Sequence, residues 1–354
     1  MDSLAERLRE RIARDGPIAF SDFMRASLYD PEAGYYARGA RIGEGGDFVT
    51  SPHVSPAFAT TLARLFSLDV EKIEGPVDFV EVGAGDGTLL RDFAAALETG
   101  DRALHARLRL TAVEGSEGGR REIAERRIAP APRILETAAE LSPESVEGWI
   151  FSNELYDALP VDRVEGAPEG LRELRVSFEA DRFVWSVVPA RPFLSDALSR
   201  FGIELEAGQR GEIAPDAEGL HRCLARALRR GWLVSFDYGH PARILYHPTA
   251  RPSGTLAVHR EGRRGGDPLE SPGERDLTAH VNWDALIAAG ESEGLRTDRL
   301  ARQGPFLIEA GVFDFASSEA EKWRVFRLVD PNGMGEEISV LIQSRGVDRE
   351  AAVL

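Results

Sequence analysis

From about residue 77 onward, short apolar runs alternate with segments in which apolar residues recur at helical spacing. The pattern predicts strands at 77–82, 108–113, 132–136 and 148–152, with helices at about 87–98 and 116–127. Strands that alternate with helices in this way typically form a parallel sheet covered by helices on both faces. The pattern therefore predicts an α/β fold of the Rossmann-like type.

Past residue 160 this alternation is interrupted and then resumes. The pattern predicts a hairpin at 171–178 and 182–188, helices at 193–201, 216–229, 282–293 and 317–328, and strands at 231–239, 296–301 and 337–343. Residues 240–280 show little periodicity and are rich in Gly, Pro, Arg and His, which is typical of a long loop. We therefore predict a core from 71–160 and 230–345, an inserted hairpin and helical subdomain at 161–229, and a second lid loop at 240–280.

Residues 1–70 are predicted to form an N-terminal helical extension and a lid. Leu4, Leu8 and Ile12 share one helical stripe, and a Pro/Gly turn near residue 31 precedes Tyr35 and Tyr36. A glycine-rich linker at 39–46 leads into the stretch GDFVTSP at 46–52, which we expect to fold over a ligand.

In that reading Thr50 and Ser51 line the ligand pocket. The alternative is that Asp47, Thr50 or Ser51 caps a following helix at Pro56–Leu68.

A glycine turn, Gly83-Ala84-Gly85-Asp86-Gly87, lies between a predicted strand and a predicted helix. Glycines allow such a turn to adopt unusual backbone conformations and let a ligand approach the main chain. A dinucleotide fingerprint would need Gly or Ala where Thr88 stands, and the Gly-Lys-Ser/Thr of a phosphate loop is missing. Glu81, just before the turn, suits a ligand that carries an ammonium group.

Glu114 ends the next predicted strand, where a carboxylate can accept hydrogen bonds from both hydroxyls of a ribose. The alternative is a solvated acid at a strand end. Taken with Glu81 and the three glycines, Glu114 favours S-adenosyl-L-methionine (SAM), whose methionine end carries an ammonium group. The sequence therefore predicts SAM as the cofactor.

Asn153, Glu154 and Asp157 follow directly after the predicted strand at 148–152. In open α/β sheets, ligands bind at the carboxyl ends of the strands. These side chains are therefore candidates for the reacting end of the site. The alternative is that Ser152 or Asn153 serves as a helix cap.

Composition narrows the possible functions. The 354 residues carry a formal net charge of −16, which argues against general nucleic-acid binding, because that depends on basic surfaces. No apolar run approaches the ~20 residues that a membrane span needs. Cys223 is the sole cysteine and is expected to pack, and no histidine pair has metal-ligand spacing, so we expect neither a disulfide nor a metal. A cytoplasmic location is the simplest expectation.

A series of motifs resembles one known family. GPIAFSDFMRASLYDPEAGYY (16–36), GDFVTSP (46–52), EVGAGDGTLL (81–90), SNELYDALPV (152–161), DYG (237–239), GTL (254–256), DPL (267–269) and PGERDLTAHV (272–281) resemble the MidA-like family of SAM-dependent methyltransferases, in the same order. That family includes the mitochondrial assembly factor for respiratory complex I, which methylates protein arginine.

The resemblance implies a Rossmann-like, seven-stranded class I methyltransferase core of bacterial type, with Gly83, Gly85, Gly87 and Glu114 holding SAM. It also implies that Asn153 and Glu154 face the transferred methyl group. The chain departs from the family pattern at His53, where an acid is usual, and at Ile338-Ser339, where Phe-Lys is common.

We therefore predict a SAM-dependent methyltransferase that modifies an arginine side chain of a protein and could form a homodimer. Glu154 is predicted to be the principal catalytic carboxylate and Asp157 the second. The cofactor residues are predicted to be Glu81, Gly83, Ala84, Gly85, Gly87, Glu114, Asn153, Thr50 and Ser51. The protein partner could be a respiratory complex subunit. The alternatives are a SAM-binding assembly factor without turnover, a small-molecule methyltransferase and, less favoured, a nicotinamide-dependent oxidoreductase.

Overall fold

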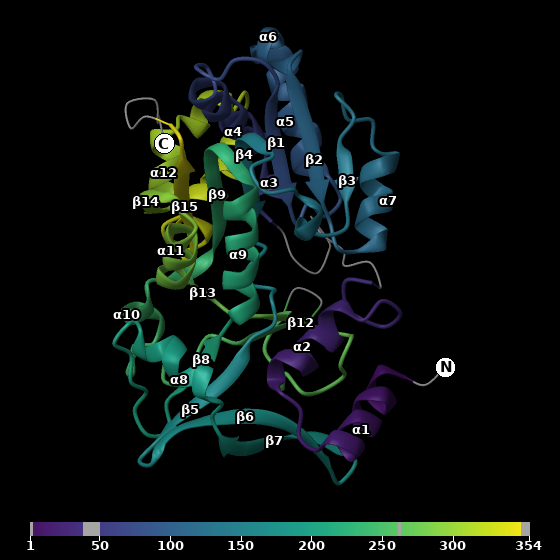
Figure 1. The fold of residues 1–354 in the computed structure, drawn as a ribbon. Coiled ribbons are helices and arrows are strands. Elements are labelled where there is room, and N and C mark those ends of the chain that lie inside the picture. The colour runs from purple at the N-terminus through teal and green to yellow at the C-terminus, as the bar shows by residue number, and fades with distance from the viewer. Residues whose placement is uncertain (1–2, 38–49, 261–262, 348–354) are drawn as a thin grey trace. The chain divides into compact units, whose positions relative to one another are not determined.

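The computed structural model of the chain describes residues 3–37, 50–260 and 263–347 (Figure 1). The chain divides into two compact units, each built from three separate segments. The core unit is Ile42–Leu155, Gly219–Tyr238 and Leu286–Leu354, and the accessory unit is Met1–Arg41, Tyr156–Glu218 and Gly239–Ala285. The predicted domain limits stay a prediction.

The core unit is built on an eight-stranded sheet in which seven strands follow the order β14-β15-β9-β4-β1-β2-β3, and the two-residue strand β13 (Val281–Asn282) pairs with the end of β9. Its strands are β1 (Val77–Val82), β2 (Leu108–Val113), β3 (Arg133–Leu135), β4 (Val146–Asn153), β9 (Leu228–His240), β14 (Arg296–Arg302) and β15 (Ile338–Arg345). Neighbouring strands from β3 to β9 are parallel, and β15 is antiparallel to both β9 and β14. This confirms the predicted Rossmann-like α/β fold.

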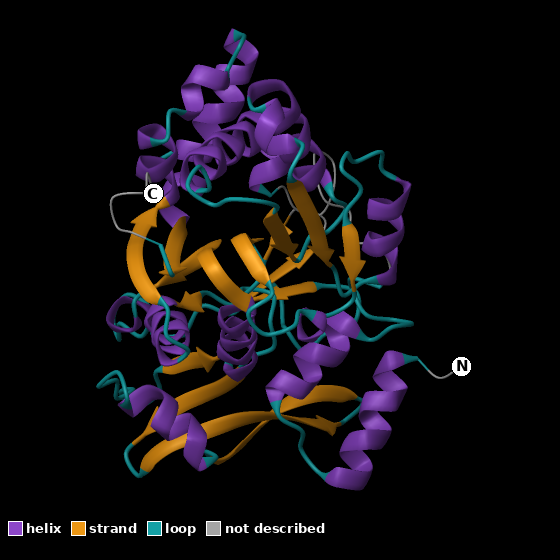
Figure 2. Cartoon of the chain, turned by 45° about the horizontal axis from the view of Figure 1, so that its top comes forward, coloured by secondary structure: helices purple, strands orange, loops and turns teal. Residues whose placement is uncertain are grey.

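Helices lie on both sides of this sheet, as Figure 2 shows. They are α3 (Ser51–Val54), α4 (Pro56–Asp69), α5 (Thr88–Gly100), α6 (Arg102–His105), α7 (Glu117–Glu125), α9 (Pro215–Ala227), α11 (Trp283–Ser292), α12 (Gln303–Glu309), α13 (Glu319–Val329) and α14 (Met334–Glu337), with 3-10 turns η1 (Ala138–Glu140) and η2 (Val312–Phe315). Of these, α9 and α11 begin in the accessory unit.

Strand β1 is buried along its whole length, and its side chains alternate between two hydrophobic clusters. Val77 and Phe79 join a cluster that includes the aromatic side chains of α4 and α5, whereas Val80 and Val82 join a second cluster with Leu224 of α9. Burial on both faces explains why β1 is a continuous apolar run interrupted only by Asp78 and Glu81. Those two acids are therefore exceptions that need an explanation.

The accessory unit contains two small antiparallel sheets, β7-β6-β5-β8 and β11-β10-β12. Its elements are α1 (Leu4–Asp15), α2 (Phe20–Tyr29), β5 (Asp162–Ala167), β6 (Gly170–Glu179), β7 (Arg182–Pro189), α8 (Pro192–Ser199), β8 (Arg210–Ile213), α10 (Ala242–Leu245), β10 (Ala257–Arg260), β11 (Arg263–Arg264), β12 (Asp276–Thr278) and β13 (Val281–Asn282). The predicted hairpin corresponds to β6 and β7. The stretch 240–280, expected to be a loop, holds α10 and β10–β12. These elements have too few residues to show a periodic pattern of hydrophobic positions.

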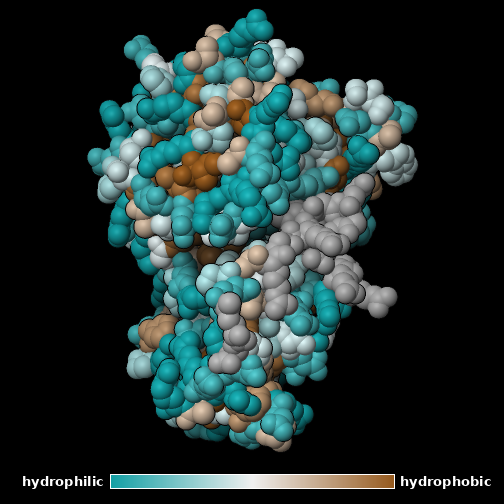
Figure 3. Space-filling view, turned by 90° about the vertical axis from the view of Figure 1, so that its right-hand side faces the viewer, coloured by the Kyte–Doolittle hydropathy of each residue, from teal (hydrophilic) through white to brown (hydrophobic). Residues whose placement is uncertain are grey.

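The face of the molecule in Figure 3 is mainly hydrophilic, with hydrophobic residues in small patches. Within the described ranges, no helix is both long and apolar enough to pass through a bilayer.

The close packing of β4 against β9 gives a test of the fold. Gly231 has φ of +127°, and a Cβ atom there would overlap the carbonyl oxygen of Gly148 on the neighbouring strand. Gly75 also has positive φ (+77°), but a Cβ atom there would meet nothing within 4 Å. We expect Gly231→Ala to lower the free energy of unfolding by about 1–3 kcal/mol more than Gly75→Ala does, because of overpacking. Denaturant titration of both variants measures the difference, and equal losses would contradict this account of the strand contact.

Candidate active site

The carboxyl ends of three parallel strands place the predicted site residues at one edge of the core sheet. Val82 of β1 lies opposite Val113 of β2 and Ser152 of β4. The next residues along the chain, Gly83, Glu114 and Asn153, therefore leave the sheet together.

The glycine turn adopts the conformations that its sequence predicted. Gly83, Gly85 and Gly87 have φ of 75°, 54° and 77°, values that residues with a Cβ atom rarely adopt. A Cβ atom at Gly87 would lie 3.0 Å from the side chain of Ile123 on α7, and one at Gly83 would lie 2.9 Å from Leu155. Both the conformation and the packing of the turn therefore favour glycine.

Glu114 is held in place by the glycine turn and by the start of α7. Its Oε2 accepts the N–H of Gly85 at 2.8 Å, and its Oε1 accepts the N–H and the hydroxyl of Ser116 at 2.8 and 2.7 Å. A carboxylate has about four acceptor positions. Three of these are occupied, so Glu114 keeps about one position for a hydroxyl group of a ligand.

Two buried oxygen atoms at this edge find no hydrogen-bond partner among the described residues. They are Oε2 of Glu81, whose side chain is buried inside β1, and Oδ1 of Asn153. Burial, followed by the charges of Asp86 and Glu114, raises the pKa of Glu81 well above its ordinary value. Buried polar atoms are normally paired, so these two oxygens indicate a ligand that donates hydrogen bonds or carries positive charge.

Asp86, in the middle of the glycine turn, differs from Glu81 because its carboxylate is well supplied with partners and its pKa is lowered. It forms an ion pair with Arg126, accepts the N–H and hydroxyl of Thr88 at 2.9 Å, and lies 3.4 Å from Nε2 of His53. Although burial opposes ionisation, these hydrogen bonds from His53 and Thr88 hold the pKa of Asp86 well below its ordinary value. Asp86 therefore supports the turn as a fixed anion.

Glu154 begins the loop after β4 and has a positive φ of 49°, which is strained for a non-glycine residue. Its Oε1 accepts the N–H of Ser51 at 3.0 Å and the side-chain amide of Asn153 at 2.9 Å. Burial raises the pKa of Glu154 to about 7, although the bonds from Ser51, Asn153 and Tyr238 and the charge of His53 oppose the rise. Glu154 can therefore change its protonation state near neutral pH.

Short helix α3 brings Thr50 and Ser51 to this edge. The Ser51 hydroxyl donates to Oε1 of Gln303 at 3.2 Å, and the Thr50 hydroxyl contacts Nδ1 of His53 at 2.8 Å. The capping alternative for Thr50 and Ser51 is wrong, because Ser55 caps α4 through the N–H of Ala57. The remainder of the predicted lid, residues 39–49 with Asp47, lies outside the described residues.

The capping alternative for the end of β4 is also wrong. The Ser152 hydroxyl is buried and donates to Ser235 on β9 at 3.1 Å, and the Asn153 amide bonds to Glu154.

Asp157 belongs to the accessory unit, not to the unit that holds the other predicted site residues. It is buried, and its carbonyl accepts the N–H of Ala279 at 2.9 Å. In the same unit, the rings of Tyr29 and Tyr36 stack with centroids 5.4 Å apart, and the Tyr36 hydroxyl donates to Asp276 at 3.2 Å. The role of Asp157 as second catalytic carboxylate stays a prediction.

Sequence reasoning missed three residues that organise this edge. Arg126 reaches Asp86 from the end of α7, Gln303 starts α12 and is completely buried, and Asp237 accepts the N–H of Leu155 at 2.9 Å. Asp237 belongs to the DYG motif and could have been found. Arg126 and Gln303 carry no local signal, because their partners are distant in the sequence.

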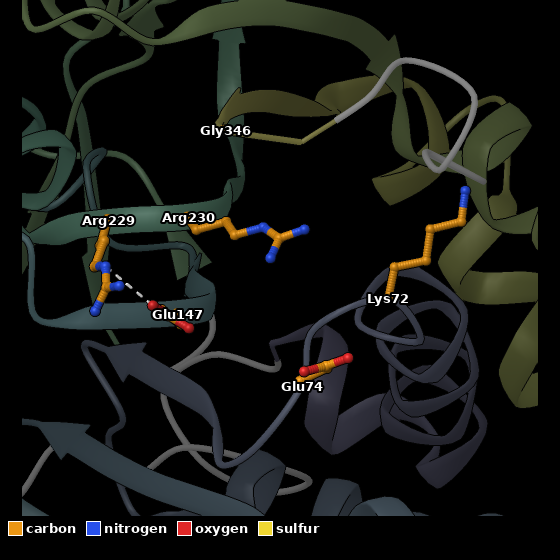
Figure 4. Close-up of a pocket in the computed structure, with 6 residues that line it drawn as sticks. All are labelled: Lys72, Glu74, Glu147, Arg229, Arg230 and Gly346. Carbon is orange, nitrogen blue, oxygen red and sulfur yellow. Dashed lines mark ion pairs between the residues drawn. The ribbon is translucent and has the colours of Figure 1, made fainter.

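A separate pocket lies at the opposite edge of the core sheet. Figure 4 shows Arg230 extending into it and Arg229 paired with Glu147 at 3.0 Å; it is lined by Lys72, Glu74, Glu147, Arg229, Arg230 and Gly346. Glu147, Arg229 and Arg230 stand near the starts of β4 and β9, away from the strand ends that carry the predicted site. In the described parts of the chain, no three His, Cys, Asp or Glu side chains gather as metal ligands.

Comparison with known proteins identifies the ligand class. A family model described as S-adenosyl-L-methionine-dependent methyltransferase matches residues 59–301. The human mitochondrial protein arginine methyltransferase NDUFAF7 is 26% identical over 381 residues, which span 95% of this chain and 82% of the human protein. Its Drosophila melanogaster homologue is 27% identical over 330 residues, or 82% of this chain and 71% of that protein.

Two crystal structures from Burkholderia thailandensis share the fold of this chain. One, bound to S-adenosyl-homocysteine, is 34% identical in sequence, with a TM-score of 0.88. The match covers 98% of this chain and 92% of the Burkholderia chain. The other is 31% identical with a TM-score of 0.86 and covers 99% and 94%.

The cofactor is therefore SAM, and the chemistry of the edge fits it. We propose that the unpartnered oxygens of Glu81 and Asn153 accept the ammonium group of its methionine part. In the same proposal Glu114 accepts a hydrogen bond from its ribose with the remaining acceptor position, and the glycine turn, with Ala84, lets the cofactor lie against the main chain. Thr50 and Ser51 remain proposed cofactor contacts beside them.

The raised pKa of Glu81 gives a test of this arrangement. Because burial raises the pKa of Glu81 in the free protein, an ammonium group that binds beside it is expected to lower that pKa and to favour loss of the proton. Calorimetric titration with S-adenosyl-homocysteine in buffers of different ionisation enthalpy should show release of up to about one proton. Glu81→Gln should abolish that release and weaken binding about tenfold or more, whereas Glu147→Gln, at the opposite edge, should change neither. Unchanged proton release in Glu81→Gln would refute this role.

Proposed function

The chain belongs to the family of S-adenosyl-L-methionine-dependent methyltransferases, and we propose that it methylates an arginine side chain of a protein. The family model matches well over half of the chain, and the protein is accordingly a SAM-dependent methyltransferase. The relatives named protein arginine methyltransferases support the choice of arginine.

The observation that carries the proposal is the position and state of Glu154. It stands one residue beyond Asn153 at the carboxyl end of β4, and one of its oxygens is fixed by Ser51 and Asn153. An arginine guanidinium is always protonated and donates hydrogen bonds in a planar fork that matches a carboxylate. A half-buried carboxylate in a fixed orientation is the partner that such an acceptor requires.

Bound SAM supplies a methyl group on a cationic sulfur. The residues of this chain have to align the acceptor nitrogen with that methyl group and exclude water. Ionised Glu154 would pair with the guanidinium, turn one nitrogen toward the methyl group and stabilise the positive charge. A bond would form from that nitrogen to the methyl carbon as the carbon–sulfur bond broke with its electron pair left on sulfur, and the nitrogen would then release one proton to solvent.

The partner is proposed by chemical class: a protein that exposes an arginine side chain. Three further statements remain predictions. They are that the partner is a respiratory complex subunit, that the enzyme is a homodimer, and that the enzyme acts in the cytoplasm of a bacterium. Asp157 remains the proposed second carboxylate.

Substitution of Glu154 tests the proposal. Glu154→Gln keeps the size and the hydrogen bond to Ser51 but removes the charge, so we expect methyl transfer to fall by about 10²–10⁴-fold. Binding of S-adenosyl-homocysteine should stay near that of the parent. The measurement is transfer of tritium-labelled methyl groups from SAM to proteins extracted from cells that lack this gene.

The pH profile supplies an independent readout. Because the ionised form of Glu154 is the active one, kcat/KM of the parent should rise with pH through about 7 and level off above it. Glu154→Gln should lack this rise with pH, and the matched control Glu147→Gln, near the start of β4, should retain it. Near-normal turnover by Glu154→Gln with cofactor binding intact would refute the assignment.

A further inference from the structure

Helix α13 of the core unit exposes aromatic side chains on the side that faces away from the core. Trp323 is 70% exposed and Phe326 is 43% exposed, and their ring centroids lie 6.0 Å apart. The opposite side of the helix, formed by Val325, Leu328 and Val329, is buried in the hydrophobic core. Paired aromatic rings on a solvent-facing side are typical of interaction surfaces.

Two arginines share this side of α13. Arg324 and Arg327 are exposed, and no described carboxylate lies within ion-pair distance of either. At about 100° per residue, Trp323, Arg324, Phe326 and Arg327 fall on one continuous side of the helix. We call these four residues the α13 outer face. It presents two aromatic rings and two free positive charges on a chain with a net charge of −16.

The buried side of α13 connects to the proposed catalytic carboxylate by hydrogen bonds. The carbonyl of Leu328 accepts Nε2 of Gln303 at 2.9 Å, and Oε1 of Gln303 accepts the Ser51 hydroxyl at 3.2 Å. The N–H of Ser51 in turn donates to Glu154. The helix that carries the α13 outer face is therefore attached to the segment that orients Glu154.

We propose that the α13 outer face is the docking surface for an acidic segment of the protein substrate, an inference that rests on the proposed function. Trp and Arg dominate the binding energy of protein interfaces, and arginine forms strong two-point hydrogen bonds with carboxylates. The proposed acceptor arginine then reaches the active site from a partner that is already held by its aspartates and glutamates.

A protein partner suits this surface better than an anionic membrane. Recognition of anionic lipids typically uses about four to eight clustered basic residues. Helix α13 has three basic side chains, one of which, Lys322, is already paired with Glu319 at 2.7 Å, and a second acid, Glu321. The aromatic and arginine composition, together with this small charge excess, favours a protein with acidic side chains.

The test compares two double variants, Trp323→Ala/Phe326→Ala and Arg324→Glu/Arg327→Glu, with the control variant Leu68→Ala. Leu68 lies on α4 and is 42% exposed. Tritium-labelled SAM and limiting amounts of protein extract from cells that lack this gene give the initial rate of protein methylation. Both double variants should lose about tenfold or more in rate, with unchanged affinity for S-adenosyl-homocysteine. Leu68→Ala should match the parent, and unchanged rates in either double variant would overturn the proposal.

A second measurement separates this proposal from the proposed function. If the parent transfers no methyl group to any protein, the proposed function fails and docking is judged by a photoreactive benzophenone side chain at position 326. Cross-links that map to an acidic segment of a partner, and that Arg324→Glu/Arg327→Glu removes, would support docking. Cross-linking no stronger than that from position 68 would overturn it.

Vesicles distinguish the other kind of partner. The parent is sedimented with vesicles of phosphatidylcholine and phosphatidylserine. Absence of binding agrees with a protein partner. Binding that Trp323→Ala/Phe326→Ala abolishes would overturn the proposal and assign the α13 outer face to a membrane surface.

Discussion

The site depends on a concentration of negative charge at one edge of a buried sheet. Glu81, Asp86 and Glu114 lie close enough for their charges to affect one another, and each is handled differently. Asp86 is neutralised by Arg126 and Glu114 is stabilised by main-chain N–H groups, whereas Glu81 has a main-chain hydrogen bond from Leu90 and no ion pair with a described residue. A buried carboxyl group without a partner is costly when ionised. The core unit therefore has a place for positive charge that its own described residues do not fill, and we propose that the ammonium group of the cofactor brings that charge.

The same principle applies to Glu154 on the acceptor side. Its burial raises its pKa, and the N–H of Ser51 and the amide of Asn153 only partly offset the cost of ionisation. A guanidinium would complete the compensation in the same way that the ammonium group does at Glu81. One oxygen of Glu154 is fixed by both Ser51 and Asn153, so Glu154 could orient a bound guanidinium as well as neutralise it. In the proposed function, two cations, one on the cofactor and one on the substrate, would each pair with one of these two acids.

Much of this could be predicted because the signals are local. The strand, glycine turn and helix from Val77 to Gly100 follow from apolar periodicity and from glycines that adopt positive φ. The remainder depends on contacts between distant segments. Gln303 joins α3 to α13, and Arg126 joins α7 to the glycine turn. Nothing in the sequence around either residue distinguishes it from an ordinary surface residue. Helix α4 shows a third limit, since Thr50 and Ser51 are its candidate caps in the sequence analysis, whereas Ser55, directly before Pro56, takes that position.

Strand β15 has a consequence for the order of events during synthesis. It is the last described strand, yet it lies between β9 and β14 and pairs with both along their lengths. While a ribosome is still making this segment, β9 has an open edge and β14 has no neighbour. The parallel half of the sheet, with the glycine turn and Glu114, can assemble earlier. The parallel strands that carry the glycine turn and Glu114 can therefore form before the sheet has closed, and the last described strand then joins β9 to β14.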